Sequence, residues 1–375
     1  MCRYGVGESV GGACHWRSDP SSVWVKTVPM ERPQRIAVLY NTDYDAELTG
    51  PGIDVSAVEI SARALTTALR DVGYTTELVG IQGTDVFEVL GRLQQSRPDL
   101  VFNLCESMSG DPRNEPTFAG LLDVFEIPYT GADLLALASC LHKQRCKEIL
   151  EARGIPTPPY RFFATEAALA DPTLETLDYP WFLKLAHEDA SVGITEESLV
   201  TSVGALRTHA AFLMKDFKQP VLAERYIDGR EVNVTLVGNG DELRVLPLHE
   251  IDFARMPAGR PRIVSYAGKW EESHVDYAGT KPVPLRDASP TLVDEIERVA
   301  RGAWHALGLR DYGRIDLRID RAGVPWVIDV NPNCDISPDA GVARSAAAAG
   351  YAYPQLVDLL TRLAWSRIQT RKVGT

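Results

Sequence analysis

The chain has 375 residues, of which 45% are hydrophobic, and its formal net charge is −12. A chain of this length and composition can bury substantial cores and predicts two or three domains. The negative charge argues against a nucleic-acid surface, because neutralising a phosphate backbone requires concentrated Lys and Arg. We find neither an apolar stretch that could cross a membrane nor a secretory signal, and therefore expect a cytoplasmic protein without membrane partners.

Residues 1–33 mix Gly, Ser, Pro and charged residues without a sustained period. We predict a disordered or loose tail there and assign it no function. Its Cys2, Cys14 and His15 are too sparse a set to indicate a metal site. The six cysteines of the chain form no CxxC pair, so reduced thiols are expected.

Residues 34–132 alternate between apolar strands and amphipathic helices, which predicts a small parallel α/β domain. The expected strands are Ile36–Tyr40, Glu77–Val79 and Leu100–Leu104, and the expected helices are Val55–Val72 and Val86–Gln95.

Residues 133–223 predict an α+β domain that opens with one long helix, which follows Ala132 and runs to Arg153. Lys143 and Lys147 lie four residues apart and therefore share a face of this helix. Strands are expected at Tyr160–Phe163, Trp181–Leu185 and Val221–Glu224, and a helix at Val203–Lys215. In the remainder, residues 224–375, strands dominate from Val232 onward and helices follow at Leu292–Leu307 and Pro354–Ile368.

A polar turn follows the strand that carries Lys184. Ser191 and Gly193 in this turn can present backbone N–H groups to phosphate, with Lys184 supplying positive charge. The motif is weak alone, and the chain contains neither a Walker motif nor a GxGxxG helix opening.

The next strand and turn supply two glutamates. Backbone groups of residues 225–227, next to Glu224, could pair with an adenine edge, and Glu231 could accept hydrogen bonds from ribose hydroxyls. The alternative is an ordinary strand and turn with surface charges.

The most informative segment is a hairpin that turns at Ala322-Gly323 and sets Asp316 opposite Asp329. Facing carboxylates repel each other unless a cation lies between them. Alternation places Arg314 and Asn331 on the same face, and places an apolar set on the other: Ile315, Leu317, Ile319, Ile328 and Val330. Oxygen ligands of this kind suit Mg²⁺ carrying a nucleotide. The alternative is a solvated hairpin.

In this order, the segments resemble the ATP-grasp superfamily, and most closely its D-alanine–D-alanine ligase branch. The resemblance covers roughly residues 34–365 and rests on Pro128-Tyr129-Thr130-Gly131, Lys143, Lys184 with Ser191-Val192-Gly193, Glu224 with Gly229-Arg230-Glu231, Gly313-Arg314-Ile315-Asp316 and Asp329-Val330-Asn331. It implies an N-terminal α/β domain followed by two subdomains, residues 133–223 and 224–375, that clamp ATP.

The resemblance also implies residue roles. Lys143 and Lys184 would hold the phosphates, Glu224 and Ile227 would border the adenine, and Glu231 would bind the ribose. Asp316, Asp329 and Asn331 would bind two Mg²⁺ ions, with Mn²⁺ as a substitute. Arg314 would stabilise a tetrahedral intermediate, and Lys269, in a mobile loop over residues 266–279, would reach the γ-phosphate. Without the resemblance, a plain surface loop would explain that segment.

The substrate half departs from the family pattern. The segment Tyr40–Tyr44 replaces an early Gly-Gly-x-Ser-x-Glu stretch, and Ala190 and Trp270 replace a Ser and a Tyr of the trio that fastens the loop. Glu106-Ser107 stands where the family has His-Gly, and Cys334-Asp335 where it has Pro-Gly. Asp329 is one methylene shorter than the usual Glu.

We therefore expect a ligase for amino acid or peptide substrates other than two D-alanines, with Glu106 or Asp335 facing a cationic or amine-bearing group. A genuine D-alanine–D-alanine ligase remains an alternative. So do a phosphotransferase, which Arg314 argues against, and a nucleotide-binding module without catalysis. A homodimer, the usual state of the relatives, is left open.

Overall fold

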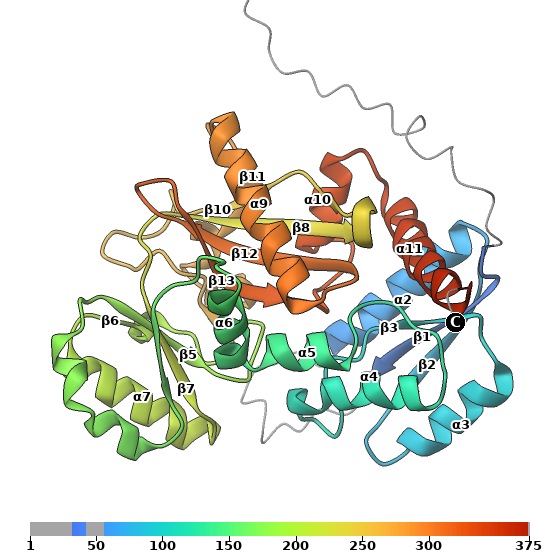
Figure 1. The fold of residues 1–375 in the computed structure, drawn as a ribbon, viewed down its shortest axis with the longest axis horizontal. Coiled ribbons are helices and arrows are strands. Elements are labelled where there is room, and N and C mark those ends of the chain that lie inside the picture. Colours follow the sequence, from blue (N-terminus) through green and yellow to red (C-terminus); the bar gives the residue numbers. More distant parts are fainter. Residues whose placement is uncertain (1–31, 43–55, 374–375) are drawn as a thin grey trace, which may run out of the picture. The chain divides into compact units, whose positions relative to one another are not determined.

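The computed structural model describes residues 32–42 and 56–373, which form three β-sheets flanked by helices (Figure 1). The predicted tail at residues 1–33, with Cys2, Cys14 and His15, lies outside the described residues except for its last two positions. None of the helices described is long and apolar enough to cross a membrane.

The first sheet is parallel, with strand order β2-β1-β3, as the alternation of strands and helices predicts. Its strands are β1 (Arg35–Asn41), β2 (Thr75–Ile81) and β3 (Leu100–Asn103). The helices α2 (Ser56–Asp71), α3 (Val86–Ser96) and α4 (Glu115–Val124) accompany it. The central strand β1 is buried at every position after Arg35, which explains its almost entirely apolar sequence.

The predicted single helix that follows Ala132 and runs to Arg153 is wrong, because the chain forms two helices, α5 (Leu134–Leu141) and α6 (Lys143–Ala152). His142 between them leaves the helical region, with φ −78° and ψ 84°. The break frees the backbone N–H of Lys143 to donate to the carbonyl oxygen of Ala186, 3.1 Å away. This bond attaches the start of α6 to the end of a strand in the second sheet.

The second sheet is antiparallel, with strand order β4-β7-β5-β6. Its strands are β4 (Tyr160–Phe163), β5 (Trp181–Leu185), β6 (Leu199–Val200) and β7 (Val221–Arg225). The amphipathic helix α7 (Val203–Phe217) packs its buried residues into the core of this sheet.

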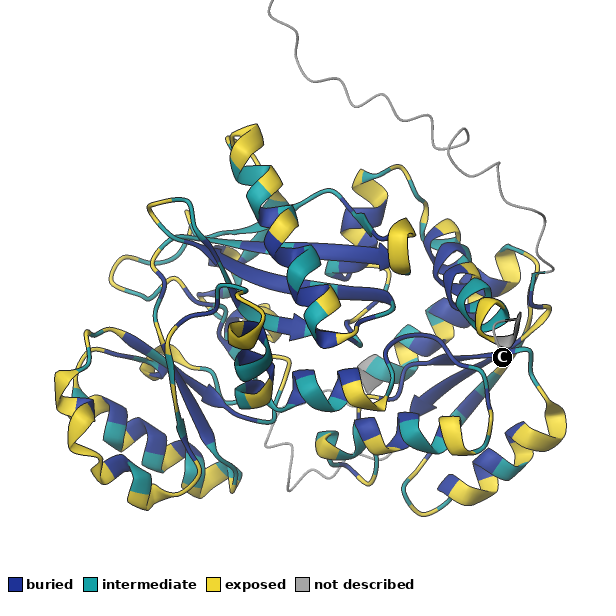
Figure 2. Cartoon of the chain, in the orientation of Figure 1, coloured by how far each residue is buried: buried dark blue, intermediate teal, exposed yellow. Residues whose placement is uncertain are grey.

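The third sheet is also antiparallel and follows the order β11-β10-β8-β12-β13, with β9 paired to β8. Its strands are β8 (Arg230–Gly238), β9 (Arg244–Val245), β10 (His249–Asp252), β11 (Lys281–Pro284), β12 (Asp311–Ile319) and β13 (Pro325–Asn331). The helices of this region are α8 (Tyr266–Trp270), α9 (Pro290–Leu307), α10 (Gly341–Ala348) and α11 (Tyr353–Val373). Figure 2 shows β8 and β12 as largely buried and α9 as exposed along its outer side.

The hairpin of β12 and β13 has the predicted register, since Asp316 pairs with Asp329 and Arg314 pairs with Asn331. The prediction for Ile328 is wrong. A β-bulge pairs Leu317 with Val327, so strict alternation fails at Ile328, which lines a pocket. Val327, instead of Ile328, lies in the core under α9.

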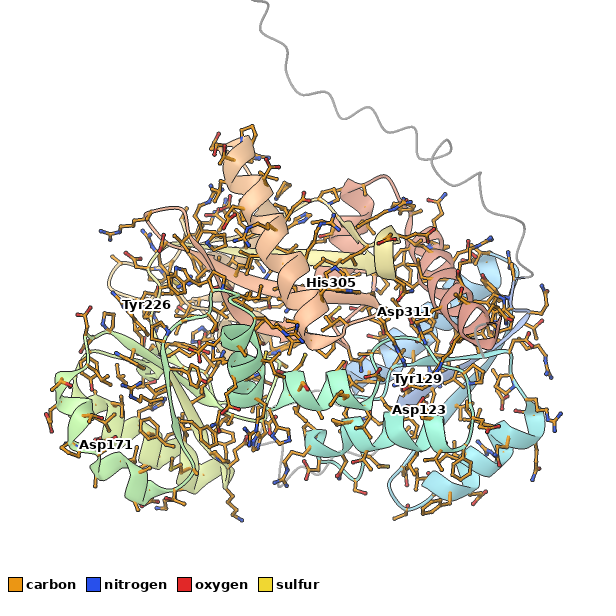
Figure 3. All side chains as sticks on the ribbon, viewed as in Figure 1. Asp123, Tyr129, Asp171, Tyr226, His305 and Asp311 are labelled. Carbon is orange, nitrogen blue, oxygen red and sulfur yellow. The ribbon has the colours of Figure 1, made fainter. Side chains whose placement is uncertain are left out.

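The first and third sheets are connected through Asp311, the first residue of β12, which is fully buried. Arg367 of α11 donates to Oδ2 of Asp311 and to the carbonyl oxygen of Tyr129, both at 2.8 Å. Oδ2 also accepts from the backbone N–H of Gly131 at 2.9 Å. Figure 3 shows the labelled Tyr129 and Asp311 close together at this connection.

Candidate active site

One pocket lies between the second and third sheets and collects most of the residues singled out in the sequence. Its lining includes Lys143, Lys184, Ser191, Glu224, Ile227, Glu231, Asp316 and Asp329. Their elements are α6, β5 and the turn after it, β7 and β8, and the hairpin of β12 and β13. Six predicted residues are not among its lining: Gly193, Lys269, Arg314, Asn331, Glu106 and Asp335.

A buried group of charges forms one wall of the pocket. Glu224 of β7 forms two ion pairs, in which its Oε1 lies 2.6 Å from Nζ of Lys147 and 3.0 Å from Nζ of Lys184. Although burial opposes ionisation, the two lysines lower the pKa of Glu224. Lys184 also donates to the carbonyl oxygen of Ile328 at 2.7 Å, and Lys147 to the hydroxyl of Thr157 at 2.7 Å. Sequence reasoning did not assign Lys147 to the site, although its spacing from Lys143 placed it on the right face.

Lys143 connects the turn after β5 to the hairpin. Its Nζ lies 2.6 Å from Oδ1 of Asp189 and 3.2 Å from Oδ1 of Asp329. Burial opposes the charge of both Lys143 and Asp329, but attraction between opposite charges prevails. Asp189 and Asp329 raise the pKa of Lys143. Lys143 and Lys184 in turn hold the pKa of Asp329 at about 2, so this carboxylate is ionised at neutral pH.

Asp316 is held by four hydrogen bonds. Arg314 donates to both of its oxygens at 2.8 Å, Asn233 to Oδ1 at 2.8 Å and Asn331 to Oδ2 at 3.2 Å. Within residues 32–42 and 56–373, no group of three His, Cys, Asp or Glu side chains lies close enough to hold a metal ion. The two carboxylates and the Asn331 amide oxygen are nevertheless hard donors whose chemistry fits Mg²⁺.

Three residues of the turn after β5 have a left-handed backbone conformation. Ala190 and Ser191 adopt positive φ angles of 54° and 65°, and Gly193 one of 74°. At Gly193 a Cβ would come within 3.0 Å of the Leu185 side chain, so this glycine shapes the turn from outside the pocket lining.

The predicted loop over residues 266–279 is wrong at its start, because residues 266–270 form the short helix α8, whereas residues 271–276 are turns or irregular. The hydroxyl of Ser265 accepts from the backbone N–H of Gly268 and caps this helix. The ammonium group of Lys269 lies 4.8 Å from the ring centre of Trp270. Desolvation and the nearby Arg314 lower the pKa of Lys269.

A polar network follows β3, around the predicted substrate residue Glu106. The backbone N–H of Glu106 donates to Oδ1 of Asn41 at 3.1 Å, and Nδ2 of Asn333 donates to Oε1 of Glu115 at 2.7 Å. Desolvation by the surrounding protein and repulsion from Asp335 raise the pKa of Glu106 to about 7. Glu106 and Asp335 are both exposed. Glu115 and Asn333 carried no recognisable motif in the sequence.

Arg318 is a further pocket residue that sequence reasoning missed. It lies two residues after Asp316 on β12 and is 3% exposed. The sequence does indicate this position, because side chains alternate along a strand and Arg318 therefore lies on the same face as Arg314 and Asp316.

Comparison with known proteins gives consistent matches. Residues 149–362 match the family described as "D-ala D-ala ligase C-terminus". An uncharacterized protein of Sinorhizobium fredii is 29% identical over 82% of this chain and 88% of its own. The D-alanine–D-alanine ligase of Methylobacterium radiotolerans is 30% identical over 79% of this chain and 90% of its own.

Solved structures of D-alanine–D-alanine ligases have the same fold. The Bacillus anthracis enzyme complexed with ATP superimposes with a TM-score of 0.69 at 20% identity, covering 92% of this chain and 100% of the other. The Coxiella burnetii enzyme gives 0.68 at 17% identity, covering 91% and 97%. These likenesses confirm the expected fold class.

Proposed function

The chain belongs to the D-alanine–D-alanine ligase family of ATP-grasp enzymes, and from this we propose that it joins a carboxylate to an amine through an acylphosphate. The observation that carries the proposal is the convergence of Lys143, Lys184, Asp316 and Asp329 on one pocket. Phosphoryl transfer depends on positioning and charge neutralisation more than on a covalent nucleophile, and these side chains supply both.

We assign the nucleotide to this pocket. Lys143 and Lys184 lie where they can turn from their present carboxylate partners to phosphate oxygens. The backbone around Ile227 borders the base, and Glu231 faces the ribose. Asp316, Asp329 and the oxygen of Asn331 would hold Mg²⁺, which when bound neutralises the triphosphate and orients its terminal phosphate.

The reaction then has two steps. A carboxylate oxygen of the first substrate attacks the γ-phosphorus, the bond to the β–γ bridging oxygen breaks, and ADP leaves. The amine of the second substrate attacks the acyl carbon, the C–O bond breaks, phosphate leaves, and the nitrogen loses a proton. Arg314, fixed on Asp316, places a guanidinium beside the developing oxyanion.

The short helix α8, which is bonded to the turn after β5, would exclude water from the pocket. Two bonds connect this turn to α8: the Trp270 indole donates to the Ala190 carbonyl at 3.1 Å, and the Tyr266 N–H donates to the Ile194 carbonyl at 3.0 Å. A segment held there covers the phosphate turn and limits hydrolysis of an acylphosphate. Lys269 lies within the same short helix.

We further propose that one substrate carries an amine or cationic group that binds beside Glu106 and Asp335. Repulsion from Asp335 contributes to the raised pKa of Glu106, and a positive ligand between the two carboxylates would offset that repulsion. The Glu106-Ser107 and Cys334-Asp335 replacements support a substrate pair other than two D-alanines. The similarity to D-alanine–D-alanine ligases supports the second candidate, which is that activity itself.

A screen of amino acids and dipeptides tests these proposals. Purified protein with ATP and Mg²⁺ is given each acid and amine pair, ADP and phosphate release are measured, and products are identified by mass. We expect a pair other than two D-alanines to be joined faster than D-alanine itself. Rapid turnover with D-alanine alone would select the second candidate. ADP release without any need for an amine would indicate a phosphotransferase instead.

A further inference from the structure

Arg318 and Glu231 form a cross-strand ion pair in the wall of the pocket. The two residues are directly paired between β12 and β8, and Nη1 of Arg318 lies 3.2 Å from Oε2 of Glu231. The side chains are only 4% and 13% exposed. Buried charges of this kind remain stable only when each one is paired and oriented.

The guanidinium of Arg318 is fixed by more than its carboxylate partner. Its Nη2 donates to the hydroxyl of Tyr226 at 2.7 Å and to the carbonyl oxygen of Arg262 at 2.6 Å. Its central carbon lies 4.9 Å from the ring centre of Tyr226, labelled in Figure 3, and 5.6 Å from that of Phe253. The guanidinium plane therefore has little freedom, and it transfers this rigidity to Glu231.

The other oxygen of Glu231 remains available. Both Glu231 and Arg318 line the pocket, and within the described part of the chain Oε1 of Glu231 has no hydrogen-bond partner. A carboxylate held through one oxygen, with the second open to the pocket, is a fixed acceptor for a hydroxyl group of a ligand. A hydrogen bond to a charged acceptor is stronger than one between neutral groups.

We propose that Arg318 is a positioning residue that fixes the Glu231 carboxylate for the ribose hydroxyls of the nucleotide, so that the pocket prefers ribonucleotides to deoxyribonucleotides. The inference rests on the proposed nucleotide pocket. It goes further by assigning a specificity role to Arg318, which contacts the nucleotide only through Glu231. Without the guanidinium, Glu231 loses both its countercharge and its fixed orientation, and the hydroxyl contact weakens.

Calorimetric titration of the whole protein with ATP, 2′-deoxyATP and 3′-deoxyATP, all with Mg²⁺, tests the proposal. For the wild type we expect at least one deoxynucleotide to bind about tenfold or more weakly than ATP, as loss of a hydrogen bond to a charged group predicts. R318M and E231Q should each bring this ratio close to one, whereas R318K, which keeps the charge, should retain part of it. R321M is the matched control, because Arg321, at the turn between β12 and β13, forms an exposed ion pair with Asp228.

A purely structural role for Arg318 would give a different result. R318M would then weaken all three nucleotides equally and leave the ratio at its wild-type value, which would overturn the proposal. If R318M does not fold, the wild type and R318K decide, since equal affinity of the wild type for the three nucleotides also overturns it. Absence of ATP binding by the wild type would instead refute the nucleotide pocket itself.

Discussion

The indole Nε1–H of Trp270 donates a hydrogen bond to the carbonyl oxygen of Ala190 over 3.1 Å. These two residues stand where the family pattern has a Tyr and a Ser, so the usual side-chain bond between the two positions cannot form. The indole reaches the backbone of the turn instead. The connection between α8 and the turn after β5 is thus made by different atoms.

W270F should loosen this connection, because phenylalanine keeps an aromatic ring but cannot donate a hydrogen bond. We expect the ratio of ADP released to amide formed to rise above one, as water reaches the acylphosphate. The measurement compares ADP and product from the same reaction. W326F is the control, since the Trp326 indole donates to Asp320 at the hairpin turn, away from α8. An unchanged ratio of ADP to amide in W270F would show that this hydrogen bond has no role in keeping water from the acylphosphate.

R314K should lose product formation with little change in nucleotide binding. Lysine keeps a positive charge but cannot make the two parallel bonds to Asp316 or present the same fork to an oxyanion. We expect kcat to fall by about 10²–10³ while the affinity for ATP stays within about threefold. Turnover and calorimetry on the same preparation separate the two effects. An equal loss of ATP affinity would mean that Arg314 serves only to hold Asp316.

D329E should lower the Mg²⁺ concentration that gives half-maximal activity, because the longer side chain restores the reach of the family's usual glutamate. D329N should raise that concentration by about tenfold or more, since an amide is a weaker ligand for a hard cation. Initial rates at saturating ATP over a range of Mg²⁺ provide the measurement. The control is D228E, where an exposed aspartate of another turn is lengthened in the same way. A higher Mg²⁺ requirement in D329E would contradict the assigned metal role.

E106Q should change how stability depends on pH. Desolvation and Asp335 raise the pKa of Glu106 to about 7 in the folded protein, above the ordinary value of 4.5. The folded state therefore keeps this proton over a range where the unfolded state has lost it, and stability falls as pH rises from 4.5 to 7. Solvent around the exposed Glu106 side chain reduces the size of this effect.

Glutamine does not ionise, so E106Q removes the pH dependence of stability that Glu106 causes. We expect the Tm of E106Q to exceed that of the wild type at pH 8.5 and to match it near pH 4. E88Q, at an exposed position on α3, should show no such difference. Equal Tm values at both pH values would show that Glu106 is not under electrostatic strain.

The hairpin register could be predicted from the sequence because the turn at Ala322-Gly323 and the alternating charges determine it locally. The bulge at Ile328 could not, since nothing in the local pattern marks which residue of a strand is left unpaired. The break at His142 could not be predicted for the same reason, because the local pattern does not mark it. The segment has helical periodicity on both sides, and the bond from Lys143 to Ala186 that accompanies the break joins residues distant in sequence.

The pocket residues that we propose for the nucleotide could be predicted from ordered motifs, whereas the residues that contact them in the structure could not. The ion pair of Lys147 with Glu224 joins positions that share no motif, and the bond of Asn333 to Glu115 joins the hairpin region to α4. Such pairs depend on which segments meet in space, which the order of residues along the chain does not state.

The acylphosphate step is tested most directly by oxygen transfer. The acid substrate found in the screen is prepared with ¹⁸O in its carboxylate, and the phosphate released during amide formation is examined by mass spectrometry. Transfer of one ¹⁸O atom to each phosphate is the predicted result, because the carboxylate oxygen that attacks phosphorus leaves with it. Release of unlabelled phosphate together with the amide would contradict activation of the carboxylate by ATP.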